Sequence, residues 1–377
     1  MKSSNEYLDS ARRFLWELSG AFGDIGVLFP LAVALIAKNG FNPTALFLMA
    51  GMFYVGSALY FRITMPVQPM KAMAVIAIAS GLGYTVINAA GIVMGFILIL
   101  ISVTGMSARL GQLFPTSVIR GIQLGLGAML VKTSLGLMST DIVIAVAAGI
   151  ILIVTMTLFK RVPPLIPLLA LGAVFSFKEM SLAVIGPVAV APALPSWNNL
   201  WQGFAVLVVP QLALTFGNAI VATNETGRLL YGEKADRLNL KNIPLSMGIA
   251  NIVSGLVGGA PMCHGCGGLT AHRKFGATSG KSGLIIGFFL IGVGLLCGRS
   301  ALAAIKAFPA SILGVLLCYV GIQHSLFIKD IVNDKKAVFV AFTVGALGFA
   351  LSNLTIGFLA GLTIHYGLSG IKKIVRV

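Results

Sequence analysis

Two short stretches of this sequence combine prolines with polar or ionisable residues inside otherwise apolar runs. They are Met65-Pro66-Val67-Gln68-Pro69-Met70-Lys71 and Pro261-Met262-Cys263-His264-Gly265-Cys266-Gly267-Gly268. A lysine at membrane depth costs about 3 kcal/mol on insertion scales, so it normally faces protein or a water-filled site. Amide, imidazole and ammonium groups donate hydrogen bonds, which is the chemistry that replaces the water shell of an anion.

Each of these stretches is expected to interrupt a helix. Proline is well tolerated only in the first turn of a helix, and the run from Ala72 to Ser80 is again apolar and compatible with a helix. We therefore expect one half-helix to begin in mid-membrane after Pro66 and a second to begin after Pro261. A helix N-terminus carries roughly half a positive charge and free N–H groups. Two such ends at one site favour an anion.

The composition is that of a polytopic membrane protein. The chain has 377 residues, is 57% hydrophobic and 10% charged, and has a mean hydropathy of +0.97, whereas soluble domains carry about 25% charged residues. The net charge of +16 does not indicate nucleic-acid binding, because no soluble basic domain carries it. The four cysteines form no secreted disulfide framework. We expect no cleaved signal peptide, since no small-residue cleavage site precedes the first apolar run.

The apolar runs predict an all-α fold of fourteen segments, seven in each half. A short amphipathic lead-in is expected over residues 1–15, and a Pro-rich loop or interfacial strand over 181–198. The first half has spans at 16–37 and 43–61, the break with its half-helix to 80, and spans at 85–104, 115–137, 142–159 and 165–177. The second half has spans at 200–221 and 244–257, the second break with a short helix to 274, and spans at 282–297, 309–323, 336–351 and 354–369.

The distribution of basic residues predicts the orientation of the chain. With the N-terminus in the cytoplasm, most basic residues fall on the cytoplasmic side, and Lys71 is buried. The basic residues that flank the outer face are Lys38, Lys132, Lys178, Arg299 and Lys306. We therefore expect a multi-pass protein of the cell (plasma or inner) membrane with both termini in the cytoplasm. Membrane lipid is an expected partner, with anionic lipid contact as a consequence of the excess charge.

An internal repeat relates the two halves. Phe22-Gly23-Asp24 in the first span matches Phe216-Gly217-Asn218 in the eighth, and the interval from Asp24 to Pro66 is one residue shorter than that from Asn218 to Pro261. Seven segments per half make the repeat inverted, with residues 1–198 as the first unit and 199–377 as the second. Paired interruptions at corresponding positions indicate the binding site of a transporter.

At these motifs the chain resembles the molybdate transporter family, distant relatives of the sulfate permease superfamily. The resemblance rests on both Phe-Gly-polar motifs, on both proline breaks and on Phe275-Gly276-Ala277, and it covers nearly the whole chain. It implies a seven-plus-seven inverted-repeat fold with a core domain of segments 1–4 and 8–11 and a gate domain of segments 5–7 and 12–14. It also implies elevator-like movement, an oxyanion substrate with molybdate first and sulfate second, and a homodimer. The chain departs from the family at Cys266, where a small residue such as Ala is expected.

The breaks and the repeat together predict the site residues. Gln68 is expected to donate its amide to the oxyanion, Lys71 to add positive charge, and Asn218 to donate directly. Asp24 is expected to pair with Lys71, orient a donor or take up a coupling proton, and Glu225 to carry a proton or lie solvated at a helix end. The candidate substrate-binding residues are Gln68, Pro69, Met70, Lys71, Asn218, Cys263, His264 and Gly265.

Several other functions are compatible with parts of the sequence. A nucleobase permease of the same architecture would need glutamates and stacking aromatics near the breaks, and few are present. Cys263 and Cys266 with His264 would suit a membrane metal-binding sensor or redox protein, but no second Cys/His pair with ligand spacing occurs. An anion channel is a further alternative. No nucleotide-binding or hydrolase motif is present, so we expect no enzyme activity, no cofactor and no metal, with H+ or Na+ as the coupling ion.

Overall fold

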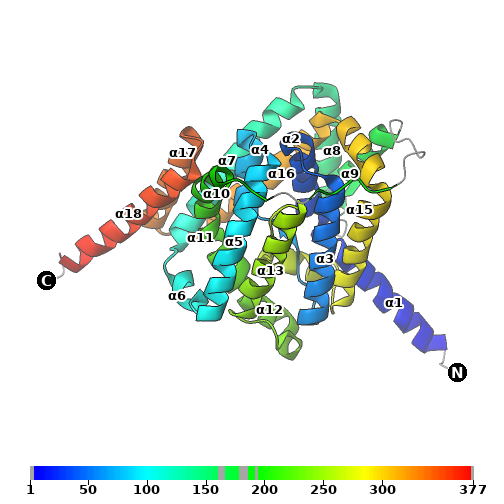
Figure 1. The fold of residues 1–377 in the computed structure, drawn as a ribbon, viewed down its shortest axis with the longest axis horizontal. Helices are drawn as coiled ribbons and strands as arrows, with labels where there is room; N and C mark the ends of the chain where they lie inside the picture. Colours follow the sequence, from blue (N-terminus) through cyan, green and yellow to red (C-terminus); the bar gives the residue numbers. More distant parts are fainter. Residues whose placement is uncertain (1–3, 160–165, 178–185, 192–193, 375–377) are drawn as a thin grey trace.

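The computed structural model of this chain describes residues 4–159, 166–177, 186–191 and 194–374. Figure 1 shows helices packed side by side in one body. Helices α1 (Ser4–Ala21) and α18 (Leu354–Ile374) project from it in opposite directions and carry the two ends of the chain. The described part is almost entirely helical, as predicted, and its sheet has two short strands.

The first half contains seven segments in the predicted order. They are α1 with α2 (Ile25–Asn39), α3 (Pro43–Phe61), strand β1 (Gln68–Pro69) with α4 (Lys71–Ser80), α5 (Tyr84–Thr104), α6 (Ser107–Gln112) with α7 (Thr116–Met138), α8 (Ile142–Leu158) and α9 (Ile166–Phe177). Helix α3 has the predicted bounds because Asn42 caps its first turn and Pro43 occupies the first helical position.

The second half repeats this order. The eighth segment of the chain, the first of this half, is one long helix in five parts: α10 (Trp197–Gly203), η1 (Phe204–Val208), α11 (Val209–Leu214), η2 (Thr215–Ala222) and α12 (Thr223–Tyr231). The remaining elements are η3 (Gly232–Ala235), α13 (Asn242–Val257), strand β2 (Met262–Cys263) with α14 (Cys266–Lys274), α15 (Lys281–Ala307), α16 (Ala310–Ser325) with η4 (Leu326–Ile331), α17 (Lys335–Ala350) and α18.

Six helical stretches of the described residues are long and apolar enough to cross a membrane. They are Arg13–Asn39, Pro43–Phe61, Tyr84–Thr104, Thr116–Met138, Trp197–Ala235 and Ala310–Ile331. Shorter apolar helices, including the half-helix Lys71–Ser80, lie between them. The protein is therefore a multi-pass membrane protein.

Three boundaries differ from the prediction. The expected lead-in continues into the first span as one helix, α1, because no proline lies between Ser4 and Ala21. The predicted span is then interrupted at residues 22–24, and α2 forms its remainder. Helix α15 continues ten residues past 297, because the next proline is Pro309. Within the predicted loop 181–198, residues 181–185 and 192–193 lie outside the described part, and 186–191 contain no strand.

Glycines allow two helix pairs to pack closely. Helix α3 packs along α15, and α5 packs along α13. A Cβ on Gly51 would lie 2.6 Å from the Gly287 carbonyl oxygen, and a Cβ on Gly95 would lie 2.8 Å from that of Gly248. Segment 2 thus pairs with 11 and segment 4 with 9, which is the same pairing made twice by an inverted repeat. A second group forms where α7 packs on α16 and α17.

Alanine at Gly287 should destabilise the protein. Its Cβ would lie 2.7 Å from Val55 Cγ2 and 2.9 Å from the Gly51 carbonyl oxygen, and overpacking of this kind costs about 1–3 kcal/mol. Gly292 lies in the same helix with nothing within 4 Å of an added Cβ, so Gly292→Ala is the matched control. Thermal unfolding in one detergent compares the two variants, and equal midpoints would contradict the packing role.

Candidate functional site

The two proline breaks cross each other in the middle of the fold. Strand β1 pairs with β2 in antiparallel register, with Gln68 opposite Cys263 and Pro69 opposite Met262. The Met70 N–H also donates to the Pro261 carbonyl oxygen at 2.9 Å. Both half-helices, α4 and α14, begin directly after this crossing. The crossing therefore brings the two helix N-termini to one place.

Buried polar side chains satisfy the backbone of the second break. Asn251 donates to the Met262 carbonyl oxygen at 2.8 Å and accepts from the Met262 N–H at 2.7 Å. His264 places Nδ1 2.8 Å from the Pro66 carbonyl oxygen and Nε2 3.1 Å from Ser246 Oγ. His264 is fully buried with both ring nitrogens engaged, so its side chain has no donor left for an anion. It joins the two breaks instead.

Gln211, which sequence reasoning missed, caps the half-helix α4. Its Oε1 accepts from the N–H groups of Ala72 at 2.9 Å and Met73 at 3.3 Å, and its Nε2 donates to Thr215 Oγ1 at 3.1 Å. The first turn of a helix leaves such N–H groups unpaired unless a cap is present. A single glutamine within the apolar run 205–214 was the sequence signal that could have indicated this role. The dipole of α4 still points at the crossing.

Asp24 forms a hydrogen bond with Gln68, and Lys71 lies within electrostatic range of its carboxylate without an ion pair within 4 Å in the described structure. The Gln68 Nε2 donates to Asp24 Oδ2, and both side chains are buried. Among the described residues, one ion pair within 4 Å is found, between Arg120 and Asp330. Lys71 therefore has no carboxylate within 4 Å in this part of the chain. Gln68 Oε1 is buried without a hydrogen-bond partner in the described structure.

The N-terminus of α14 is the open side of the site. Gly265 precedes the helix and supplies no side-chain cap. Cys266 is partly exposed, Gly267 is exposed, and the Cys266 Sγ donates to Asn218 Oδ1 at 2.9 Å. A Cβ on Gly265 would lie 3.3 Å from Asn218 Nδ2, so glycine keeps the amide close to the helix end. Asn218 comes from the π-helical part η2, and such distortions are frequent at functional sites.

Glycine at position 268 allows α14 to approach the Asp24–Gln68 pair. A Cβ there would lie 2.5 Å from Asp24 Oδ2, 2.6 Å from Gln68 Nε2 and 2.6 Å from Pro66 Cβ. The Phe-Gly-Asp break also packs against α14, since a Cβ on Gly23 would lie 2.8 Å from the Ala271 carbonyl oxygen. The first Phe-Gly-polar motif therefore contacts the second half-helix, although the sequence places them far apart.

The site is electropositive. Lys71 is the first residue of α4 and is partly buried, and two helix N-termini meet beside it. Arg120, which sequence reasoning also missed, lies on α7 within electrostatic range of the Cys266 thiol. Its guanidinium pairs with Asp330 and packs over Phe327 at 5.3 Å, and its Nε is buried without a partner among the described residues. The arrangement can hold a small anion.

The remaining candidates lie outside this open side. Pro69, Met70 and Cys263 are buried in the crossing, where they contribute packing and backbone. Glu225 is exposed on α12, and no hydrogen bond in the described structure connects it to the site. In the described ranges, no group of three or more His, Cys, Asp or Glu residues is arranged to hold a metal ion.

Comparisons with known proteins agree with this geometry. The sequence profile of the family described as "Molybdate transporter of MFS superfamily" matches residues 16–130 and 203–323, and each range contains one Phe-Gly-polar motif and one proline break. The chain is 27% identical to "Molybdate transporter 2" of Arabidopsis thaliana, over 93% of this chain and 86% of the relative.

Two solved structures share the fold. The transmembrane domain of the cyanobacterial bicarbonate transporter BicA superposes with a TM-score of 0.68 at 19% identity, over 93% of this chain and 97% of that one. The murine anion transporter Slc26a9, in its inward-facing state, gives a TM-score of 0.67 at 16% identity, over 95% of this chain and 68% of that one. At these identities the likeness shows the fold alone.

Removing the cap of α4 should destabilise the protein. Gln211→Leu leaves the N–H groups of Ala72 and Met73 buried without an acceptor, at a cost of about 1–3 kcal/mol for each unsatisfied group. Gln211→Glu keeps an acceptor oxygen at the same place and should retain most of the stability. Thermal unfolding of both variants in one detergent measures the difference. A Gln211→Leu protein as stable as Gln211→Glu would contradict the cap.

Proposed function

Because the chain belongs to the molybdate transporter family, we propose that it is a secondary active transporter of a tetrahedral oxyanion, with molybdate first and sulfate second. One observation carries this proposal. Lys71 lies at the positive end of α4, opposite a second helix N-terminus, with no carboxylate within 4 Å among the described residues. A cation at a helix N-terminus is unfavourable by itself. A bound dianion converts that repulsion into attraction.

The donors for the anion come mainly from α14. The N–H groups of Cys266 and Gly267 lie in the first turn of this helix, and Gly265 before them supplies no side-chain cap. Asn218 Nδ2 and Lys71 Nζ complete the set from the eighth segment and from α4. Charge-assisted bonds of this kind are shorter and about twice as strong as neutral ones.

Gln68 and Asp24 form a buried pair next to these donors. The amide nitrogen of Gln68 is held by Asp24, so the free atom of this side chain is the acceptor Oε1. An acceptor next to the site suits a proton carried on the anion or on a water molecule. Asp24 is buried without a cation within 4 Å in the described structure. We therefore assign Asp24 to the coupling ion, H+ or Na+, because a buried carboxylate can take up a proton and, together with Gln68 Oε1, can offer oxygen ligands to a cation.

Transport requires the site to change sides of the membrane. We assign α1–α5 and α10–α15 to the core domain, which carries the site, and α6–α9 with α16–α18 to the gate domain. The two groups meet where the Phe114 and Phe216 rings stack at 5.4 Å and where α4 packs on α7. Elevator-like movement would break these contacts, expose the anion on the other side and leave the strand crossing intact. We also propose that the protein lies in the cell membrane with both termini in the cytoplasm, an orientation that the distribution of basic residues supports.

Replacing Lys71 tests the central charge of the site. Lys71→Met should weaken molybdate binding about 10- to 100-fold, because a hydrogen bond to a charged group contributes about 1.5–3 kcal/mol. The fold should persist, since the lysine makes no ion pair within 4 Å in the described structure. Calorimetric binding and proteoliposome uptake measure the effect.

Lys234→Met is the matched control, because Lys234 is exposed in η3. Unchanged binding by Lys71→Met would refute the role of the lysine. Wild-type vesicles that take up uracil but neither molybdate nor sulfate would overturn the proposed substrate class and favour a nucleobase permease.

Thiol labelling tests where the anion binds. Cys266 is partly exposed at the open end of α14, and Cys318 is partly exposed on α16. In single-cysteine proteins, saturating molybdate should slow maleimide labelling of Cys266 several-fold, because the anion covers the thiol. Labelling of Cys318 should not change. Equal labelling rates of Cys266 with and without molybdate, in a protein that binds molybdate, would place the anion elsewhere.

A further inference from the structure

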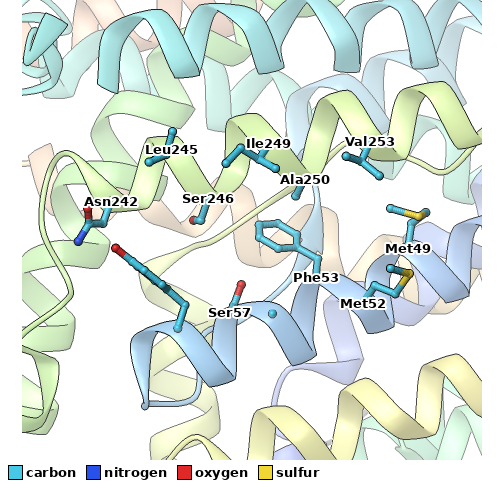
Figure 2. Close-up of a pocket in the computed structure, with 12 residues that line it drawn as sticks. Met49, Met52, Phe53, Ser57, Asn242, Leu245, Ser246, Ile249, Ala250 and Val253 are labelled. Carbon is cyan, nitrogen blue, oxygen red and sulfur yellow. The ribbon is translucent and has the colours of Figure 1, made fainter. Parts of the chain in front are cut away.

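A groove of about 350 Å³ lies between the apolar helices α3 and α13 (Figure 2). Figure 2 shows Leu245, Ile249 and Val253 along α13, and Met49, Met52 and Phe53 along α3. Most of its wall is apolar, although Ser57 and Ser246 reach into it. Because α3 and α13 are corresponding segments of the two halves, the groove lies between the two repeat units.

The groove is open at membrane depth. Met52 is 50% exposed, Ile249 52% and Val253 41%, so no described element of this chain covers these walls. Helix α3 is long and apolar enough to span a membrane, and α13 is one of the shorter apolar helices. An exposed apolar groove along two apolar helices of a membrane protein faces hydrocarbon, so an acyl chain can lie in it.

One end of the groove is polar and cationic. Tyr60 and Asn242 line that end. The Arg237 Nη1 donates to the Tyr60 carbonyl oxygen at 3.0 Å, and its guanidinium lies 5.6 Å from the centroid of the Tyr60 ring. Arg62 and Lys241, both exposed, cap the adjoining ends of α3 and α13.

The acidic groups near this end are fewer than the cations. The nearby loop also carries Glu233 and Asp236, both exposed. The Asp236 carboxylate accepts from the backbone N–H of Arg237, and no ion pair within 4 Å joins it to the Arg237 guanidinium in the described structure. The guanidinium therefore keeps donors for a phosphate, which it binds with matching geometry.

We propose that this groove binds one anionic phospholipid, with an acyl chain between α3 and α13 and its phosphate at Arg237. The apolar walls and the cationic end lie in the order in which a phospholipid presents its chain and its headgroup. The excess of positive charge at this end selects an anionic headgroup over a zwitterionic one. A second protein chain would match the apolar walls but would leave the cationic end without a counter-charge.

The bound lipid would brace the crossing of the two breaks. Phe53 and Ser246 line the groove, and both contact His264, with ring centroids 4.8 Å apart and Ser246 Oγ 3.1 Å from Nε2. His264 in turn bonds the Pro66 carbonyl oxygen. An acyl chain packed on Phe53 would therefore restrict the element that holds both half-helices, and should raise the unfolding temperature.

Native mass spectrometry and thermal unfolding test this site on the full chain. The probes are nanodiscs of phosphatidylcholine with and without phosphatidylglycerol. The wild type should retain one phosphatidylglycerol per chain and unfold at a higher temperature when that lipid is present. Arg237→Gln should weaken retention about tenfold, as expected for the loss of a charged hydrogen bond. Ala250→Phe should fill the groove and abolish both effects.

The controls are Arg109→Gln, which removes an exposed arginine of α6, and Val146→Phe, which adds a ring at an exposed position of α8. Both should behave as the wild type. Unchanged lipid retention and unfolding shift in Arg237→Gln would overturn the proposal, even if Ala250→Phe fails to fold. An altered oligomer mass in Ala250→Phe, with lipid retention intact, would instead show that the groove is an interface between copies of the chain.

Discussion

The structure depends on one constraint, which is that every backbone polar group at membrane depth needs a partner within the protein. Two proline breaks in mid-membrane would leave many such groups unpaired. The strand pairing of Gln68 with Cys263, the two bonds of Asn251 to Met262 and the cap of Gln211 on α4 supply those partners. Close packing at glycines joins α3 to α15 and α5 to α13, the helices that adjoin the two breaks.

The two half-helices are related by the repeat but are not equivalent in chemistry. Gln211 accepts from the N–H groups of Ala72 and Met73 in the first turn of α4, whereas Gly265 before α14 supplies no side-chain cap. Helix α4 therefore contributes a capped, rigid end and the charge of Lys71, whereas α14 contributes uncapped N–H donors. We propose that a tetrahedral oxyanion binds between the N-termini of these two half-helices.

Hydropathy and proline positions were sufficient to predict the order of segments, both half-helices and the repeat, because helix breaks are local properties of the chain. Side-chain partners were predicted less well. Gln211 and Ala72 are distant in sequence, and their contact depends on how the eighth segment is rotated about its axis. The same applies to His264, for which the sequence left open a bond to the anion or a role in holding the loop, and which joins the two breaks. It also applies to Asp24, for which pairing with Lys71, orienting a donor and taking up a proton were open, and which holds the Gln68 amide. No sequence pattern fixes such rotations.

Membership of the molybdate transporter family and the fold shared with BicA and Slc26a9 agree with this account, and the position of the anion remains its central claim. Crystals soaked in molybdate and measured at the molybdenum absorption edge locate the metal directly by anomalous scattering. We predict one strong peak between the N-terminus of α14, Asn218 and Lys71. A peak elsewhere, or no peak at a molybdate concentration that saturates binding in solution, would contradict the account.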